Sequence, residues 1–234
     1  MAYTAQGFLD TLKPYVLADM RASNILASLT AAQAFIESNK GNSGLAVKAN
    51  NLFGIKGTYQ GQSVTMKTTE YYNGVKTTVN AAFRKYPSWK ESIADHSALF
   101  NRLVRYSNLR GCTDYVQACK NVQADGYATS PTYANTLIST INIYRLHEWD
   151  AEVLGNPVTP QPVTKYPTLR RGDRNDYVLC WQRYLNLSGY PCGLEDGIFG
   201  VNTEIAVKEY QKSKGLSPDG VIGKKTWGSL GFTV

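Results

Sequence analysis

The sequence predicts an α+β protein with a mainly helical N-terminal part, one β-hairpin and a smaller, separate C-terminal part. Three observations support this fold class. Apolar residues recur at helical spacing in several segments before residue 150. The segment from Val64 to Val75 alternates between apolar and polar residues and turns at Asn73-Gly74, which is a strong hairpin signal. Four of the nine prolines lie between Pro157 and Pro167, where neither helical nor strand periodicity is present.

The proline-rich stretch marks the expected domain boundary. Proline fixes φ and removes a hydrogen-bond donor, so this stretch should be an extended, semi-rigid spacer. A chain of 234 residues has room for one large domain or two modest ones. We therefore expect a first domain over residues 1–150, a linker over 151–167 and a second domain over 168–234.

Composition excludes several classes of protein. Hydrophobic residues make up 43% and charged residues only 18%, so most of the chain can bury a core and wholesale disorder is excluded. No apolar run approaches the ~20 residues of a membrane span, so we expect no membrane insertion. The start lacks a basic stretch followed by an apolar segment, so a secretory signal peptide is not expected.

The net charge of +7 favours an anionic partner. Nucleic acid, anionic lipid and an anionic cell wall all satisfy this condition. The basic residues are spread along the chain rather than clustered, which argues against nucleic acid.

The cysteines and histidines show no metal-ligand spacing, so we assign neither a metal site nor a cofactor. Reduced, partly buried thiols are the favoured interpretation, and one disulfide within each half of the chain is the alternative. The residues are Cys112, Cys119, Cys180, Cys192, His96 and His147.

Capping signals predict where three N-terminal helices begin. Thr30-x-x-Gln33 has capping-box spacing and predicts a short helix through Ser38, ended by Asn39-Lys40-Gly41. Ser88-x-x-Glu91 predicts a second helix. Ser130-Pro131 predicts the last one, whose apolar positions begin at Tyr133.

Two carboxylates are candidates for acid–base chemistry. Glu37 lies in the last turn of its predicted helix, where the helix dipole and partial burial would both raise its pKa and suit a general acid. Gln33, one turn earlier on the same face, would line the same groove. Glu70 shares a strand face with Met66. A pair of such groups fits hydrolysis of a glycosidic bond, whereas a solvated helix-end glutamate and an edge carboxylate are the alternatives.

Further candidates for substrate binding each have a packing alternative. Phe53 and Tyr86 would be either sugar-facing rings or core aromatics. Asn51 would either contact an acetamido group or fix a turn. Tyr133 is included with these substrate-binding candidates.

The C-terminal part contains an internal repeat. Asp196-Gly197-Ile198-Phe199-Gly200 and the following Thr203 recur 23 residues later as Asp219-Gly220-Val221-Ile222-Gly223 and Thr226. We expect Asp-Gly to form a tight turn, the apolar pair to enter a core, and the second Gly to supply a φ that other residues resist. The Thr should cap a helix.

Further motifs accompany the repeat. They are Leu169-Arg170-Arg171-Gly172-Asp173, Trp181-Gln182-Arg183-Tyr184-Leu185 and Ala206-Val207-Lys208-Glu209-Tyr210-Gln211. Together with the two Asp-Gly motifs, they make this part of the chain resemble the peptidoglycan-binding type 1 domain. This resemblance implies a small three-helix module that holds cell-wall material and performs no chemistry.

The N-terminal part carries a series of motifs in order along the chain. They include Leu29-Thr30-Ala31-Ala32-Gln33-Ala34-Phe35-Ile36-Glu37-Ser38, Asn50-Asn51-Leu52-Phe53-Gly54-Ile55, Thr69-Glu70-Tyr71-Tyr72-Asn73-Gly74, Phe83-Arg84-Lys85-Tyr86, Ser92-Ile93-Ala94-Asp95-His96 and Gly126-Tyr127-Ala128-Thr129. With these motifs the chain resembles the glucosaminidases of glycoside hydrolase family 73 over roughly residues 20–147. The resemblance implies a lysozyme-like α+β domain that cuts the β-1,4 bond after N-acetylglucosamine in peptidoglycan.

The resemblance also assigns roles. Glu37 matches the family's general acid, Glu70 the second acidic residue in the hairpin lobe, and Tyr127 a cleft tyrosine. The chain carries Asn39-Lys40-Gly41-Asn42-Ser43 where members often have Gly-Trp-Gly-x-Ser, so a ring near the acid is missing.

Together these features predict a phage endolysin-like, monomeric peptidoglycan hydrolase that cuts between N-acetylglucosamine and N-acetylmuramic acid. It would be made in the host cytoplasm and reach the wall after release. The alternatives are a lytic transglycosylase or muramidase on the same fold, and a non-catalytic wall-binding protein.

Overall fold

A computed structural model describes residues 2–72, 75–155 and 167–230, and it divides into two compact units, Met1–Thr113 and Asp114–Val234. The first unit ends well before the proline-rich stretch. Residues 156–166 of the expected linker lie outside the described residues, so the domain limits derived from the sequence stay a prediction.

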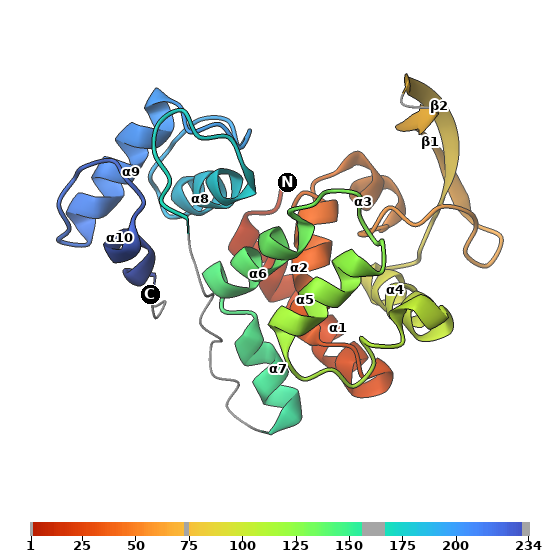
Figure 1. Ribbon diagram of the computed structural model, residues 1–234. Coiled ribbons are helices and arrows are strands. Elements are labelled where there is room, and N and C mark those ends of the chain that lie inside the picture. The colour runs from red at the N-terminus through yellow and green to blue at the C-terminus, as the bar shows by residue number, and fades with distance from the viewer. Residues whose placement is uncertain (1, 73–74, 156–166, 231–234) are drawn as a thin grey trace. The chain divides into compact units, whose positions relative to one another are not determined.

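The first unit is built around a central helix. Every residue from Ala27 to Phe35 in this helix is buried. Helix α1 packs against both α2 and α4, and the strands form a hairpin that projects beyond these helices (Figure 1). The elements are α1 (Ala5–Ser23), α2 (Ala27–Glu37), α3 (Gly44–Ala49), β1 (Ser63–Tyr72), β2 (Val75–Arg84), α4 (Trp89–Arg102) and the 3-10 turn η1 (Val104–Tyr106).

The start of α2 differs from the capping-box prediction. The helix begins at Ala27, so Thr30 is a buried residue of its interior, and Leu26 at the N-cap makes no side-chain hydrogen bond. Burial of the apolar residues on either side of Thr30 extends the helix past the position where its hydroxyl would have capped it. The predicted end is correct, since Asn39, Lys40 and Gly41 all have positive φ.

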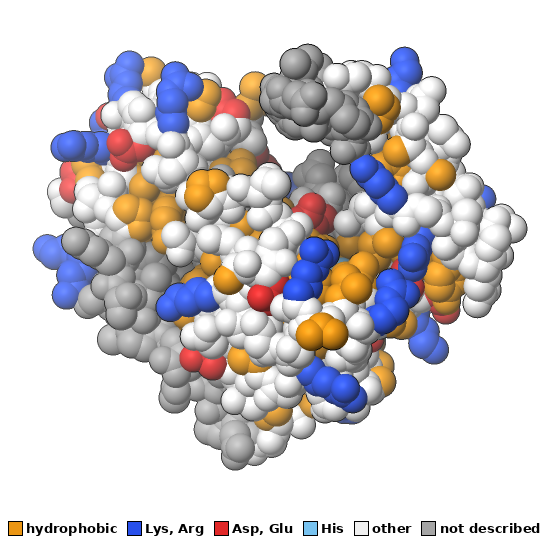
Figure 2. All heavy atoms as spheres, turned by 45° about the vertical axis from the view of Figure 1, so that its right-hand side comes forward, with side chains coloured by type: hydrophobic (Ala, Val, Ile, Leu, Met, Phe, Trp, Pro, Cys, Tyr) orange, Lys and Arg blue, Asp and Glu red, His pale blue; other side chains and the backbone are white. Residues whose placement is uncertain are grey.

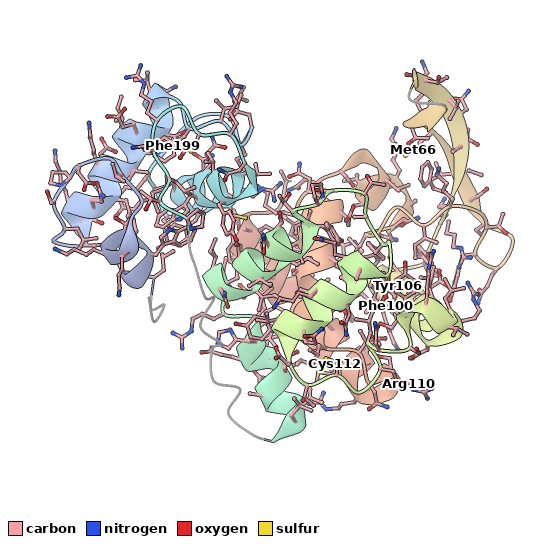
Figure 3. All side chains as sticks on the ribbon, viewed as in Figure 1. Met66, Phe100, Tyr106, Arg110, Cys112 and Phe199 are labelled. Carbon is pink, nitrogen blue, oxygen red and sulfur yellow. The ribbon has the colours of Figure 1, made fainter. Side chains whose placement is uncertain are left out.

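Helix α4 begins where the sequence predicts. Ser88 is its N-cap, its hydroxyl accepts a hydrogen bond from the Lys90 N–H and donates one to Glu91. This hydrogen bond lowers the pKa of Glu91. At the far end, Phe100 packs edge-on against Tyr106 with ring centroids 4.9 Å apart, which holds η1 against the helix (Figure 3).

The hairpin is also as predicted. Strands β1 and β2 pair antiparallel in a continuous register from Ser63↔Arg84 to Tyr72↔Val75. The predicted turn at Asn73-Gly74 lies outside the described residues.

The second unit contains six described helices. Helix α6 starts at Tyr133, two residues after the predicted Ser130-Pro131 start, and packs against α5. The three C-terminal helices confirm the helical character expected of this region. The elements are α5 (Tyr115–Ala124), α6 (Tyr133–Ile143), α7 (His147–Leu154), α8 (Asp176–Leu187), α9 (Val201–Ser213) and α10 (Lys224–Gly228).

Two predictions about the internal repeat were wrong. The first glycines, Gly197 and Gly220, have the positive φ, whereas the second ones are N-caps of α9 and α10 with ordinary negative φ. Thr203 and Thr226 lie inside these helices and are buried.

Buried glutamine side chains explain the repeat. The Gln182 amide donates to the Asp196 carboxylate, the Ile198 carbonyl and the Thr203 hydroxyl over 2.9–3.1 Å. In the second copy, Gln211 makes the same three bonds to Asp219, Val221 and Thr226. The hydroxyl of each threonine therefore accepts a hydrogen bond from a glutamine and does not cap a helix.

All four cysteines are free thiols, so the disulfide alternative is not observed. Burial raises the pKa of Cys192 to about 11, which keeps this thiol protonated and unreactive near neutral pH. Among the described residues, no helix combines the length and apolarity needed to cross a membrane.

Candidate active site

Glu37 is the last residue of α2, and the loop that follows it is tightly held. The Ser38 hydroxyl donates to the Ala34 carbonyl (2.5 Å) and accepts from the Gly41 N–H (2.7 Å). The Ser38 carbonyl accepts from the Ser43 N–H, and Ser43 caps α3. The backbone on which the Glu37 carboxylate is mounted is therefore fixed before a substrate arrives.

The exposure of Glu37 differs from the expectation. Its side chain is exposed, so the partial burial predicted from the sequence is not observed. The helix end remains as a local influence on the carboxylate, because the dipole of α2 disfavours an anion at its C-terminus.

Gln33 does not line an open groove. It is fully buried inside α2, because the helix lies at the centre of the unit and is covered on all sides over this turn. The structure therefore favours a packing role for Gln33 over contact with a substrate.

The hairpin approaches the acid loop at its base. A Cβ added to Gly44, the first residue of α3, would lie 3.3 Å from the terminal methyl of Met66 in β1 (Figure 3). Glu70 occupies a register position on the same strand face, four residues or ~13 Å further out, and pairs with Thr77. Its side chain lies outside the described residues.

A charged network fixes the hairpin to α4. Asp95 accepts two hydrogen bonds from the Arg84 guanidinium at 2.6 and 2.7 Å, and one from the Tyr86 hydroxyl at 2.6 Å. Burial, and then Asp95, raise the pKa of the Tyr86 phenol far above its ordinary value. Tyr86 is almost fully buried, so its ring and hydroxyl are used in packing and not offered to a sugar.

The side chains of Asn51 and Phe53 are also used in packing within the protein. The Asn51 amide donates to the carbonyls of Ile55 and Arg84, and its oxygen accepts from the Ile55 N–H. Phe53 stacks on His96 with ring centroids 3.8 Å apart. Burial lowers the pKa of His96 to about 3, so the imidazole is neutral near pH 7 and cannot serve as an acid.

Tyr127 and Tyr133 lie together in the second unit. Their rings stack with centroids 5.9 Å apart and an interplanar angle of 19°. The Gln123 side chain accepts a hydrogen bond from the Ala134 N–H, which ties the start of α6 to α5. Tyr133 is buried and Tyr127 is partly exposed, so Tyr133 packs behind the more accessible ring of Tyr127.

The C-terminal helices carry a separate candidate binding surface. A hollow of about 250 Å³ lies beside the first copy of the repeat, and its lining includes Leu194, Val201 and Asn202. Leu194 is 81% exposed and Val201 48% exposed, which is unusual for large apolar side chains beside a hollow. The floor is fixed by Gln182, which also lines it.

Sequence reasoning missed three positioning groups: Ser38, the Arg84–Asp95 pair and the glutamines of the repeat. Each of them lies within a segment that carried a resemblance. None gives a periodic or capping signal of its own, because their partners are backbone groups or residues distant in the sequence.

Comparisons with known proteins agree with this geometry. Residues 13–146 match the family described as mannosyl-glycoprotein endo-beta-N-acetylglucosaminidase, and residues 175–230 match a putative peptidoglycan binding domain. The catalytic domain of the autolysin Auto from Listeria monocytogenes has a similar structure, with a TM-score of 0.60 and 35% sequence identity. That alignment covers 64% of this chain and 89% of the solved one.

Two curated relatives are similar over the same region. Exo-glucosaminidase LytG of Bacillus subtilis is 41% identical over 150 residues, which are 62% of this chain and 53% of that protein. A probable N-acetylmuramidase of Lactococcus lactis subsp. cremoris is 33% identical over 165 residues, 65% of this chain and 37% of that protein. The chain thus spans about half or less of the length of these relatives.

Proposed function

The chain belongs to the glucosaminidase family, glycoside hydrolase family 73, and we propose that it cleaves the β-1,4 bond between N-acetylglucosamine and N-acetylmuramic acid. It is a peptidoglycan hydrolase with a peptidoglycan-binding domain after its catalytic region. The observation that supports the proposal is that Glu37, which the sequence resemblance matches to the family's general acid, ends α2 directly before a loop held by Ser38.

Glu37 would act as general acid. Its carboxyl group donates a proton to the glycosidic oxygen as the bond to the leaving sugar breaks and positive charge develops at the anomeric carbon. Ser38 contributes by fixing the carboxylate-bearing backbone, so less motion has to be frozen when the substrate binds.

Glu70 would act from the hairpin. Glu70 has a register position on the strand face of Met66 but further out, and it would activate water or stabilise positive charge if the hairpin bends toward the bound glycan. The network of Arg84, Tyr86 and Asp95 holds the base of the hairpin during such a movement.

Mass spectrometry of muropeptides released from purified walls tests the bond assignment. New reducing ends should be N-acetylglucosamine. Reducing N-acetylmuramic acid would instead support a muramidase, the activity in the name of the Lactococcus lactis relative. A 1,6-anhydro product would identify a lytic transglycosylase, and both outcomes would refute the proposal.

We also propose that the protein works as a phage endolysin that accumulates in the host cytoplasm and is released through a membrane pore. A wall hydrolase joined to a wall-binding module supports this role. On the face shown in Figure 2, Lys and Arg side chains are spread out, which suits an extended anionic wall better than nucleic acid. Expression in a bacterium should cause lysis only when a pore-forming protein is co-expressed, and lysis without one would contradict this role.

A further inference from the structure

Another hollow, of about 410 Å³, lies in the first unit, and we call it the N-terminal aromatic pocket. This volume lies within the range of small-ligand sites, about 300–1,000 Å³. The pocket is formed by the start of the chain, α1, the loop after Glu37, α3 and the start of α4. Its lining includes Tyr3, Tyr15, Val47, Asn50 and Trp89.

The pocket is uncharged although the protein is basic. Its lining holds no Asp, Glu, Lys, Arg or His, while the chain as a whole carries 43 acidic and basic residues and a net charge of +7. A charged ligand, such as a peptide with ionised side chains or a phosphodiester, would find no counter-charge here. The ligand that fits is neutral.

Tyr3, Tyr15 and Trp89 line the space, and packing contacts hold the rings of Tyr3 and Trp89. Trp89 packs edge-on against Phe8 and tilted against Tyr3, each with centroids 5.1 Å apart. Gly41 has positive φ, and a Cβ at this position would lie 3.0 Å from the Trp89 ring. The glycine therefore lets the loop after the acid close onto the indole.

The pocket also offers unused hydrogen-bonding groups. Within the described part of the chain, no hydrogen bond is made by the hydroxyls of Tyr3 and Tyr15, the indole N–H of Trp89 or Oδ1 of Asn50. The Asn50 amide nitrogen is already used, since it donates to the carbonyls of Tyr86 and Pro87. Aromatic rings combined with one free amide oxygen, two tyrosine hydroxyls and an indole N–H match a pyranose, which has apolar C–H faces and a polar rim.

The pocket is separate from the Glu37 carboxylate. Phe35 faces α1, where its ring packs against Phe8. Glu37 follows Phe35 by two residues, about 200° around the helix axis, so it points to the other side of α2. The two sites share the loop after Glu37 but open on different faces.

We propose that the N-terminal aromatic pocket binds an N-acetylglucosamine unit of a glycan strand, away from the bond that is cut. The Asn50 oxygen would accept the acetamido N–H, and the Trp89 indole would donate to the acetamido carbonyl. N-acetylmuramic acid is disfavoured because its lactyl group bears either a carboxylate or a stem peptide with charged groups. That the sugar belongs to peptidoglycan rests on the proposed function, whereas the preference for a neutral acetamido sugar follows from the lining.

The Trp89 indole provides a site-specific readout. We would titrate the full-length Glu37→Gln protein, labelled with ¹⁵N, with the tetramer of N-acetylglucosamine and follow the indole N–H resonances by NMR. The Trp89 resonance, assigned with Trp89→Phe, should shift and saturate. Trp149, Trp181 and Trp227 lie outside the pocket and serve as internal references.

Two exposed valines give a matched pair of variants. Val47 is 71% exposed and lines the pocket, so Val47→Asp places a charge there without disturbing the core. It should weaken the response of Trp89 about tenfold or more. Val104, 87% exposed and outside the pocket, is the control, and Val104→Asp should bind as tightly as the parent.

Three results would overturn the proposal: a Trp89 resonance that does not move at saturating tetramer, equal weakening by both valine variants, or a Trp89 shift with free stem peptide that exceeds the shift with sugar. This readout needs no turnover. A wrong bond assignment would therefore appear in the muropeptides and leave the Trp89 titration unaffected.

Discussion

At the scale of single residues, the proposed chemistry depends on Glu37 and on the groups that hold its backbone. Ser38 bridges the last turn of α2 and the following loop through its hydroxyl, so the carboxylate starts from a fixed position. A glycan bound over the exposed Glu37 side chain would exclude water from it, and exclusion of water favours the protonated form that a general acid needs.

Glu37→Gln tests this role directly. The amide cannot donate a proton to the leaving oxygen, so the rate of wall hydrolysis should fall by about 100-fold or more. Wall binding should be unchanged, because the C-terminal helices are untouched. The measurement is release of reducing ends from purified walls, with Glu152→Gln, an exposed glutamate of α7, as the control. Activity close to the parent level in Glu37→Gln would remove the assignment.

His96 makes stability depend on pH. Its pKa is about 3 in the folded protein and about 6.5 when unfolded, so between these values the unfolded chain binds more protons and stability increases with pH. Lowering the pH from 7 to 5 should cost about 2 kcal/mol of unfolding free energy through this group.

Urea titrations at pH 5 and pH 7 measure this effect. His96→Phe keeps a flat ring against Phe53 and removes the titration, so the difference between the two pH values should shrink by that amount. His147 is present in both proteins and its contribution cancels. An unchanged difference in the variant would show that another group is responsible.

At the scale of elements, the hairpin is an arm fixed at its base. Arg84 lies at the end of β2, Asp95 in the middle of α4, and Tyr86 in the connection between these elements. The carboxylate therefore joins strand, connection and helix. Among the described residues, the outer part of the hairpin, where Glu70 lies, pairs between its own two strands.

Asp95→Asn should loosen this fixed base. The neutral amide retains one oxygen for Arg84 and Tyr86, and we expect a loss of about 2 kcal/mol in unfolding free energy. The rate of hydrolysis should fall while binding to walls stays unchanged. Asp10→Asn, at an exposed position of α1, is the control. Full activity in a destabilised Asp95→Asn protein would show that the base of the hairpin does not position the site.

Glu70→Gln separates the roles of the two carboxylates. The loss of rate should be smaller than for Glu37→Gln, because no proton has to be delivered from this position. If Glu70 activates water, azide should restore part of the rate and give a glycosyl azide of inverted configuration, detectable by NMR. A retained azide product would indicate that the acetamido group of the substrate is the nucleophile. If the Glu70→Gln protein has the parent rate, Glu70 is a solvated residue at the edge of the hairpin and has no catalytic role.

Elements with strong local signals could be predicted, and those fixed by distant partners could not. The hairpin and the Ser88 cap follow from alternation and capping within a few residues. The sequence motifs predict that three threonines cap helices, yet all three are buried within helices: Thr30, Thr203 and Thr226. Their hydroxyls face the interior because burial of the surrounding residues decides where these helices start, which a local motif does not reveal.

The same limit applies to the site. Glu37 is a candidate because the helix end and the motif agree, and its role stays a prediction. Gln33, Asn51 and Tyr86 were substrate-binding candidates, and the structure shows that they are buried. A polar or aromatic residue near an acid has the same sequence signature whether it contacts a sugar or supports the loop. Only the backbone partners of Asn51 and the Asp95 partner of Tyr86 show which role applies.

At the scale of the whole molecule, the proposed enzyme would act on an insoluble polymer. The binding module would raise the local concentration of the catalytic region at the wall without contacting the bond that breaks. Its effect should therefore depend on the substrate: large for intact walls and absent for short soluble fragments. The hollow beside Leu194 is the candidate surface for this attachment.

Leu194→Asp tests the coupling in the full-length protein. Leu194 is 81% exposed, so the charge should not disturb the core that surrounds Trp181. Loss of an apolar contact at a binding hollow should weaken co-sedimentation with walls about tenfold and slow hydrolysis of walls to a similar extent. The rate on soluble glycan fragments should not change, because these reach Glu37 without the module.

Ile205→Asp is the matched control, since Ile205 is 51% exposed on α9 but does not line the hollow. Equal losses in both variants would indicate a diffuse apolar surface, and a lower rate on soluble fragments would show that the module acts on catalysis and not on attachment.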